Sequence, residues 1–131
     1  MKIFVVVSLA LLLLACGVPE DQYQIPAQKW EDIVIKVESQ PAPVVVGMNE
    51  FLILATLERG KPVHELVIAL RGGDSEPWQQ AIQDGFSGVY RKAVIVPPGV
   101  DELQVQVRRK RTENEVVLYF PMFSAKTAVQ K

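Results

Sequence analysis

The feature that most constrains the fold is an alternation of apolar and polar side chains with a period of two. Between Ile33 and Val37 every second residue is apolar, with Val34 as the one exception, and the same alternation runs from Leu103 to Val107. This pattern is typical of β-strands that bury one face. The chain is therefore expected to fold largely from half-buried strands.

Two further runs, Phe51–Leu57 and Leu66–Leu70, are apolar at both parities and are expected to form strands buried on both faces. Val89–Val96 and Val116–Phe120 complete the expected set. Turn residues separate these segments, namely Gly47, Gly60-Lys61-Pro62, Gly72-Gly73, Gly88 and Pro97-Pro98-Gly99. The spacing predicts an all-β fold, an immunoglobulin-like antiparallel β-sandwich of about seven strands.

The stretch from residue 74 to residue 85 departs from this alternation. Ser75 suits the N-cap of a helix, Pro77 suits its first turn, and Gly85 could end it. Three apolar residues follow at helical spacing: Trp78, Ala81 and Ile82. We therefore predict one short helical crossover, in which Trp78 either closes an open end of the sandwich or stacks on a ligand.

The amino-terminal segment has the features of a signal peptide. Met1-Lys2 supplies a positive charge, and the apolar run Ile3–Leu14 is well short of the roughly 20 residues that span a bilayer. Leu13-Leu14-Ala15-Cys16 resembles the lipobox of bacterial lipoproteins. The resemblance implies that signal peptidase II removes residues 1–15 and that Cys16 carries a diacylglycerol and an N-acyl chain. The alternative is that Cys16 is an ordinary buried thiol.

Removal of 15 of the 131 residues leaves 116, enough for one domain. We expect a flexible tether over residues 16–29, a sandwich domain over 30–125 and a carboxy-terminal tail over 126–131. The loss of Lys2 changes the formal charge from −1 to −2, and this near balance argues against a nucleic-acid partner. We expect a monomeric domain with no cofactor other than the covalent lipid.

Two or more acyl chains anchor a protein stably to a membrane. In Gram-negative lipoproteins an aspartate after the acylated cysteine favours retention at the inner membrane, and this chain has Gly17 at that position. The resemblance therefore implies the periplasmic side of the outer membrane rather than the inner membrane. In a Gram-positive host the same motif would imply the outer face of the single membrane.

A second resemblance involves the turns and strands between about residues 44 and 121. The segments are Gly47-Met48-Asn49-Glu50-Phe51, Gly60-Lys61-Pro62-Val63, Gly88-Val89-Tyr90, Pro98-Gly99, Leu103–Val107 and Tyr119-Phe120. In order and spacing they resemble the YtkA-like immunoglobulin-type sandwich. Some members of that family are linked to copper handling or respiratory-oxidase maturation, so the resemblance implies a copper accessory protein as an alternative function.

Copper(I) prefers soft thioether and imidazole ligands, which here would come from Met48, His64 and Met122. Each has a simpler interpretation. His64 is expected to lie hydrogen-bonded at the rim of the core, and the methionines are expected to fill gaps in packing. We therefore predict no metal site and keep these three residues as weak candidates.

The sequence contains no signature of an enzyme. No serine lies in a Gly-x-Ser-x-Gly elbow, and the paired carboxylates fall at strand starts or in a hairpin, where a solvated surface explains them. We therefore expect a non-catalytic binding or assembly module of the cell envelope, with an envelope protein as its partner.

The basic run Arg108–Arg111 is expected at the tip of the last hairpin. It is either a solvated turn or a contact for anionic lipid headgroups or an acidic partner through Arg108, Lys110 and Arg111. Arg109 shares parity with the inward Val107, so its stem is expected to pack. Trp78 and Tyr90 are the other candidate contact residues.

Overall fold

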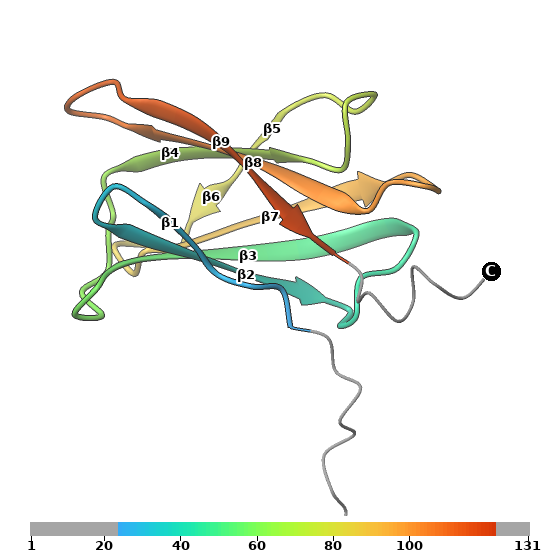
Figure 1. Ribbon diagram of the computed structural model, residues 1–131, viewed down its shortest axis with the longest axis horizontal. Helices are drawn as coiled ribbons and strands as arrows, with labels where there is room; N and C mark the ends of the chain where they lie inside the picture. The colour runs from blue at the N-terminus through green and yellow to red at the C-terminus, as the bar shows by residue number, and fades with distance from the viewer. Residues whose placement is uncertain (1–23, 123–131) are drawn as a thin grey trace, which may run out of the picture.

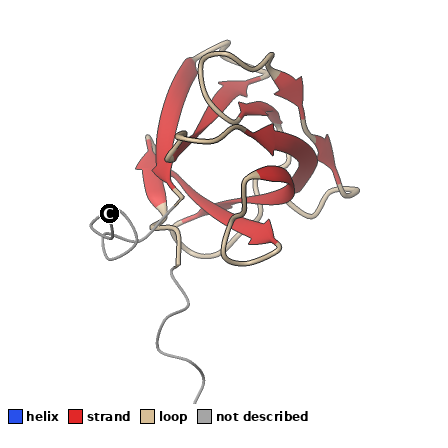
Figure 2. Cartoon of the chain, turned by 90° about the vertical axis from the view of Figure 1, so that its right-hand side faces the viewer, coloured by secondary structure: helices blue, strands red, loops and turns tan. Residues whose placement is uncertain are grey.

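A computed structural model of the protein describes residues 24–122. The described residues form nine strands and no helix, arranged as two antiparallel sheets that pack face to face (Figures 1 and 2). The predicted all-β sandwich of antiparallel sheets is therefore confirmed, with nine strands where about seven were expected. The predicted signal peptide, Cys16 and the tail 126–131 lie outside the described residues.

The first sheet has the order β1-β2-β3-β7-β6, and the second has the order β5-β4-β8-β9. The strands of the first sheet are β1 (Gln28–Trp30), β2 (Ile33–Gln40), β3 (Gly47–Leu57), β7 (Val89–Val96) and β6 (Ile82–Gln83). Those of the second are β5 (Gln79–Gln80), β4 (Leu66–Arg71), β8 (Glu102–Arg109) and β9 (Glu115–Pro121). No segment of residues 24–122 forms a helix that could cross a membrane.

The core lies between the sheets and is formed by alternate residues of the long strands. Its fully buried side chains come from both sheets and include Ile33, Ile35, Phe51, Ile53, Ile68, Leu70, Leu103, Val105, Val107 and Phe120. The prediction that β3 and β4 are buried on both faces is wrong, because Leu52, Leu54 and Val67 are only partly buried. They lie on the outer faces of the sheets, which no further layer of described residues covers.

The predicted helical crossover is also wrong. Gln79 and Gln80 of β5 pair with β4, whereas Ile82 and Gln83 of β6 pair with β7, so the segment passes from one sheet to the other in an extended conformation. At the crossing point Ala81 is 7% exposed, and its N–H donates to the Ile68 carbonyl over 2.8 Å. Tertiary pairing therefore prevails over a helix too short to repay its nucleation cost.

The folded part of the chain begins earlier than the predicted boundary at residue 30. Gln28 and Lys29, which were expected in the tether, pair with Ile35 and Val34 of β2. Ile25 also packs against the core. We did not predict strand β1, because an alternation of apolar and polar residues cannot be recognised over only three residues.

The outer edge of β7 is only partly covered. β6 pairs with Tyr90 and Arg91, so the edge from Lys92 to Val96 has no partner strand among residues 24–122. Lys92 is the register partner of the buried Phe51, which places its side chain on the inner face of the sheet. A cation thus points between the sheets at an open edge.

Candidate functional site

The sandwich has two ends with different chemistry, at opposite ends of its long strands (Figure 1). We call one the hairpin end; it contains the β1–β2 turn (Glu31-Asp32) and the β8–β9 turn (110–114). We call the other the tether end, after the tether that the sequence predicts before it; it contains the β2–β3 loop (41–46), the β7–β8 loop (97–101) and Gln24, the first described residue.

The basic run lies at the hairpin end, as predicted. Arg108 and Arg109 end β8, Lys110 and Arg111 begin the turn, and Arg108 faces Glu115 in the register of β8 with β9. The placement at the tip of the last hairpin is therefore confirmed.

Carboxylates surround these cations. Arg109 Nε lies 2.8 Å from Glu31 Oε2, its guanidinium also contacts the carboxylate of Asp32, and the group lies 5.7 Å from the centroid of the Trp30 ring. The Arg109 side chain is 25% exposed, which confirms that its stem packs. Arg111 pairs with Glu65 over 2.8 Å.

Counted with Glu113 in the turn and Glu115 opposite Arg108, five carboxylates accompany the four cations of the hairpin end. The sequence run is strongly basic, but in the folded domain its charge is locally compensated. The tip therefore presents individual cations, among them Lys110, rather than a continuous positive surface.

The tether end presents an apolar surface instead. Its exposed side chains are Val45 (44%), Val46 (59%), Met48 (59%) and Ile95 (47%), which we call the apolar end patch. Met48 and Ile95 face each other as register partners on β3 and β7. Val45 and Val46 directly precede β3, so all four residues belong to the start of β3, the loop before it and the facing part of β7.

Asn49 fixes the loop that carries this patch. Its side-chain amide is buried, accepts a hydrogen bond from the Val45 N–H over 3.0 Å, and donates to the carbonyls of Val45 (2.7 Å) and Gly47 (3.0 Å). A buried amide with three satisfied hydrogen bonds holds a loop in one conformation. The valines are therefore held outward by the fold.

A pocket of about 250 Å³ adjoins the patch at the open edge of β7. Met48 and Ile95 line it together with charged groups, Arg71, Glu76 and Lys92. Arg71 connects this pocket to Trp78, because its guanidinium carbon lies 4.3 Å from the centroid of the indole ring. Arg71 Nε also donates to the buried Gln104 over 2.8 Å. Trp78 is thus half-buried against an arginine on the second sheet, and it is not among the partly buried hydrophobic side chains that pack on the core.

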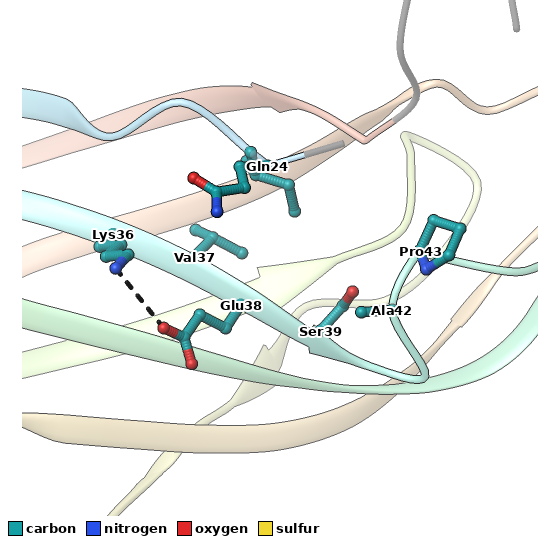
Figure 3. A pocket seen from close by; sticks show the side chains of 8 residues that line it. Gln24, Lys36, Val37, Glu38, Ser39, Ala42 and Pro43 are labelled. Atoms are coloured by element: carbon teal, nitrogen blue, oxygen red, sulfur yellow. Dashed lines mark ion pairs between the residues drawn. The ribbon is translucent and has the colours of Figure 1, made fainter. Parts of the chain in front are cut away.

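A second pocket, of about 280 Å³, lies where the chain enters the fold (Figure 3). Gln24 and Ile25 line one part, and Ala42 and Pro43 of the β2–β3 loop line another. The floor is formed by the outer part of β2, including Lys36 and Glu38, whose charged groups lie 3.6 Å apart. The entry of the chain and the loop that leads to the apolar end patch are therefore neighbours.

The three weak metal candidates do not converge. Met48 is exposed at the tether end and Met122 is buried, whereas His64 precedes β4 at the hairpin end, 5.6 Å from the Phe86 ring in an edge-to-face contact. His64 is exposed, so its predicted place at the rim of the core is wrong. Within residues 24–122 no three His, Cys, Asp or Glu side chains gather in a way that could hold a metal ion.

Tyr90 is a core residue rather than a contact residue. It is 2% exposed, its hydroxyl donates to the Val63 carbonyl over 3.0 Å, and it accepts from the Leu66 N–H over 3.3 Å. Burial raises the pKa of its phenol, an effect that the hydrogen bond from the Leu66 backbone partly offsets. The prediction of a surface role for Tyr90 is therefore corrected.

The sequence analysis did not identify the apolar end patch. A signal was present, because Val44-Val45-Val46 is an apolar run without alternation that follows Pro41-Ala42-Pro43 and precedes a turn glycine. Only Val44 of this run is buried.

No family model, curated protein or solved structure matches the chain in comparisons with known proteins.

Proposed function

We propose that the protein is a lipid-anchored, non-catalytic binding or assembly module of the bacterial cell envelope. The observation that carries the proposal is the position of Cys16. It ends an apolar segment of signal-peptide length, follows Leu13-Leu14-Ala15, and stands eight residues before Gln24, where the described sandwich begins. An acylated Cys16 would tie this sandwich to a membrane through a short tether.

The location that we propose is the periplasmic side of the outer membrane, because Gly17 rather than aspartate follows the cysteine. The partner that we propose is a protein of the envelope. The hairpin end supports this choice: its cations are paired with carboxylates from the turns that precede β2 and β4, and such a mixed surface favours another patterned protein surface over a uniformly anionic one.

The anchor is tested by metabolic labelling with radioactive palmitate. Cys16→Ser removes the only cysteine of the chain, so we expect labelling to be lost and the precursor to accumulate. Gly17→Ala is the matched control, because it changes the neighbouring residue and leaves the thiol in place. Equal labelling of wild type and Cys16→Ser would contradict the proposal.

The location is tested by fractionation of membranes in a Gram-negative host. We expect wild type in the outer membrane and Gly17→Asp in the inner membrane, with Gly17→Ala distributed as wild type. If wild type and Gly17→Asp fractionate identically, the proposed sorting is wrong, although the lipid anchor can still stand on the palmitate result.

A further inference from the structure

We propose that the apolar end patch docks on the lipid surface to which the protein is anchored, so that the domain stands on the membrane with its tether end down. The inference rests on the proposed lipid anchor at Cys16. A lipid anchor alone does not determine which face of the domain contacts the membrane; the face that we propose contains Val45, Val46, Met48 and Ile95.

The first argument is the composition of the surface. Val46 and Met48 are each 59% exposed, and Val45 and Ile95 are nearly half-exposed, so one end of the β3–β7 pair and the loop that enters it expose four large apolar side chains. Asn49 holds the loop in place through three hydrogen bonds, so the valines cannot turn inward without breaking them. Several large apolar side chains held exposed at one end of a domain are typical of an interaction site.

The second argument is the reach of the tether. Eight peptide units separate Cys16 from Gln24, so the two lie at most about 29 Å apart whatever conformation the intervening residues adopt. Gln24 and Ile25 share a pocket with Ala42 and Pro43, and Val45 is two residues beyond Pro43. A lipid anchor at Cys16 would therefore keep Gln24 within about 29 Å of the bilayer surface, and the patch lies at the same end of the domain as Gln24.

The third argument is the position of the charged surface. β3 runs for 11 residues between the two ends, a length of about 35 Å, and the ion-paired cations lie at its far end. The β2–β3 loop (41–46) contains no charged residue, whereas Asp101 and Glu102 of the tether end are acidic. Arg71 and Lys92 of the adjoining pocket are accompanied by Glu76, so this end has no excess of positive charge, and apolar insertion rather than attraction to anionic headgroups is the contact that it favours.

The experiment uses the mature lipidated protein reconstituted in vesicles of phosphatidylethanolamine and phosphatidylglycerol. Because Cys16 is the only native cysteine and its thiol would carry the lipid, an introduced cysteine gives a single site for an environment-sensitive fluorophore. The label is placed at Val46→Cys in the patch, or at Lys110→Cys in the hairpin turn. Quenching by spin-labelled lipids reports the depth of each label.

We expect about threefold or more stronger quenching at position 46 than at position 110, with little dependence on salt. In the protein labelled at position 46, Met48→Asp should reduce quenching to the level seen at position 110. Phe86→Asp is the matched control, because Phe86 is another exposed apolar residue and lies beside His64, outside the patch. That variant should leave quenching at position 46 unchanged.

The outcomes separate this inference from the proposed function. Protein that fails to sediment with the vesicles overturns the anchor, and the docking with it. Protein that sediments but is quenched equally at positions 46 and 110 overturns the docking alone. A photo-crosslinker at position 46 that captures another protein in cells, in place of lipid, would assign the patch to a protein partner and also overturn the docking.

Discussion

The Tyr90 hydroxyl lies 3.0 Å from the Val63 carbonyl oxygen and so links β7 of one sheet to the segment that leads into β4 of the other. The same hydroxyl accepts a hydrogen bond from the Leu66 N–H over 3.3 Å. One buried oxygen thereby satisfies a donor of the opposite sheet, Leu66, and an acceptor of the segment that leads into it, Val63, which ties the two sheets together at the hairpin end.

Tyr90→Phe is expected to lower the free energy of unfolding by about 1–3 kcal/mol, because two backbone groups lose their partner in a buried site. Urea denaturation of the protein lacking residues 1–16 measures the change. Tyr119→Phe is the matched control; Tyr119 is exposed and should shift stability by no more than about 0.5 kcal/mol. Equal effects of the two substitutions would contradict the structural role of Tyr90.

The raised pKa of Tyr90 also predicts a pH dependence. Since the folded state holds the proton more tightly than the unfolded chain, the stabilisation is fully present below the unfolded pKa of about 10 and is lost as pH rises through the folded pKa. Urea midpoints between pH 8 and 11 should therefore fall less steeply for Tyr90→Phe than for wild type. Parallel curves would show that the Tyr90 phenol does not titrate differently on folding.

The long strands could be predicted because their evidence is local. Each contains a run of five or more mostly apolar residues, and the two alternating runs, Ile33–Val37 and Leu103–Val107, point their apolar residues into the core as expected. The segment from 74 to 85 could not be predicted in this way, since the conformation of Ala81 depends on a hydrogen bond to Ile68, 13 residues earlier in the chain. Local spacing carries no information about that partner.

The candidate site was likewise predictable only where the evidence lies in neighbouring residues of the chain. The placement of Arg108–Arg111 at a hairpin tip follows from the pattern of the two flanking strands, but the neutralising carboxylates do not. Glu31, Asp32 and Glu65 come from turns more than 40 residues away along the chain and meet the arginines only in the folded domain. A run that reads as basic is therefore charge-balanced in three dimensions.

Gly72→Ala is expected to destabilise the domain by about 3 kcal/mol. A Cβ at this position would lie 2.3 Å from the Ile95 carbonyl oxygen and 3.0 Å from Val96 Cα, and because both are backbone atoms the sheets would have to separate. Gly60→Asn serves as a control, since a Cβ there meets nothing and asparagine tolerates its positive φ. The midpoints of thermal unfolding of the two variants test this expectation. Similar midpoints for both would contradict the close approach of Gly72 to the backbone of Ile95 and Val96.

Arg109→Gln is expected to cost about 1 kcal/mol, because it removes the contacts to Glu31 and Asp32 and the packing on Trp30 at a partly exposed site. Lys110→Gln removes one neighbouring charge in the exposed turn and should stay within about 0.5 kcal/mol of wild type. The measurement is again urea denaturation. If Lys110→Gln is the more harmful change, the assignment of Arg109 as the packed residue is wrong.

The copper alternative predicts a measurable affinity. Since Met48, His64 and Met122 lie apart, we expect a competition titration with a chromogenic chelator to detect no stoichiometric copper(I) binding by the protein lacking residues 1–16. Binding that Met48→Leu or His64→Gln abolishes would instead favour the accessory-protein function. Binding unaffected by either substitution would have to use other ligands.

The inward position of Lys92 matters when many copies of the protein are crowded together. Beyond Arg91 the edge of β7 has no partner strand among residues 24–122, so its backbone could in principle join the edge of a neighbouring molecule and begin a continuous sheet. Such an extension would bury the Lys92 ammonium, which lies on the same face as Phe51, between two molecules. One inward-pointing charge therefore opposes polymerisation at the exposed edge and favours a dispersed monomer.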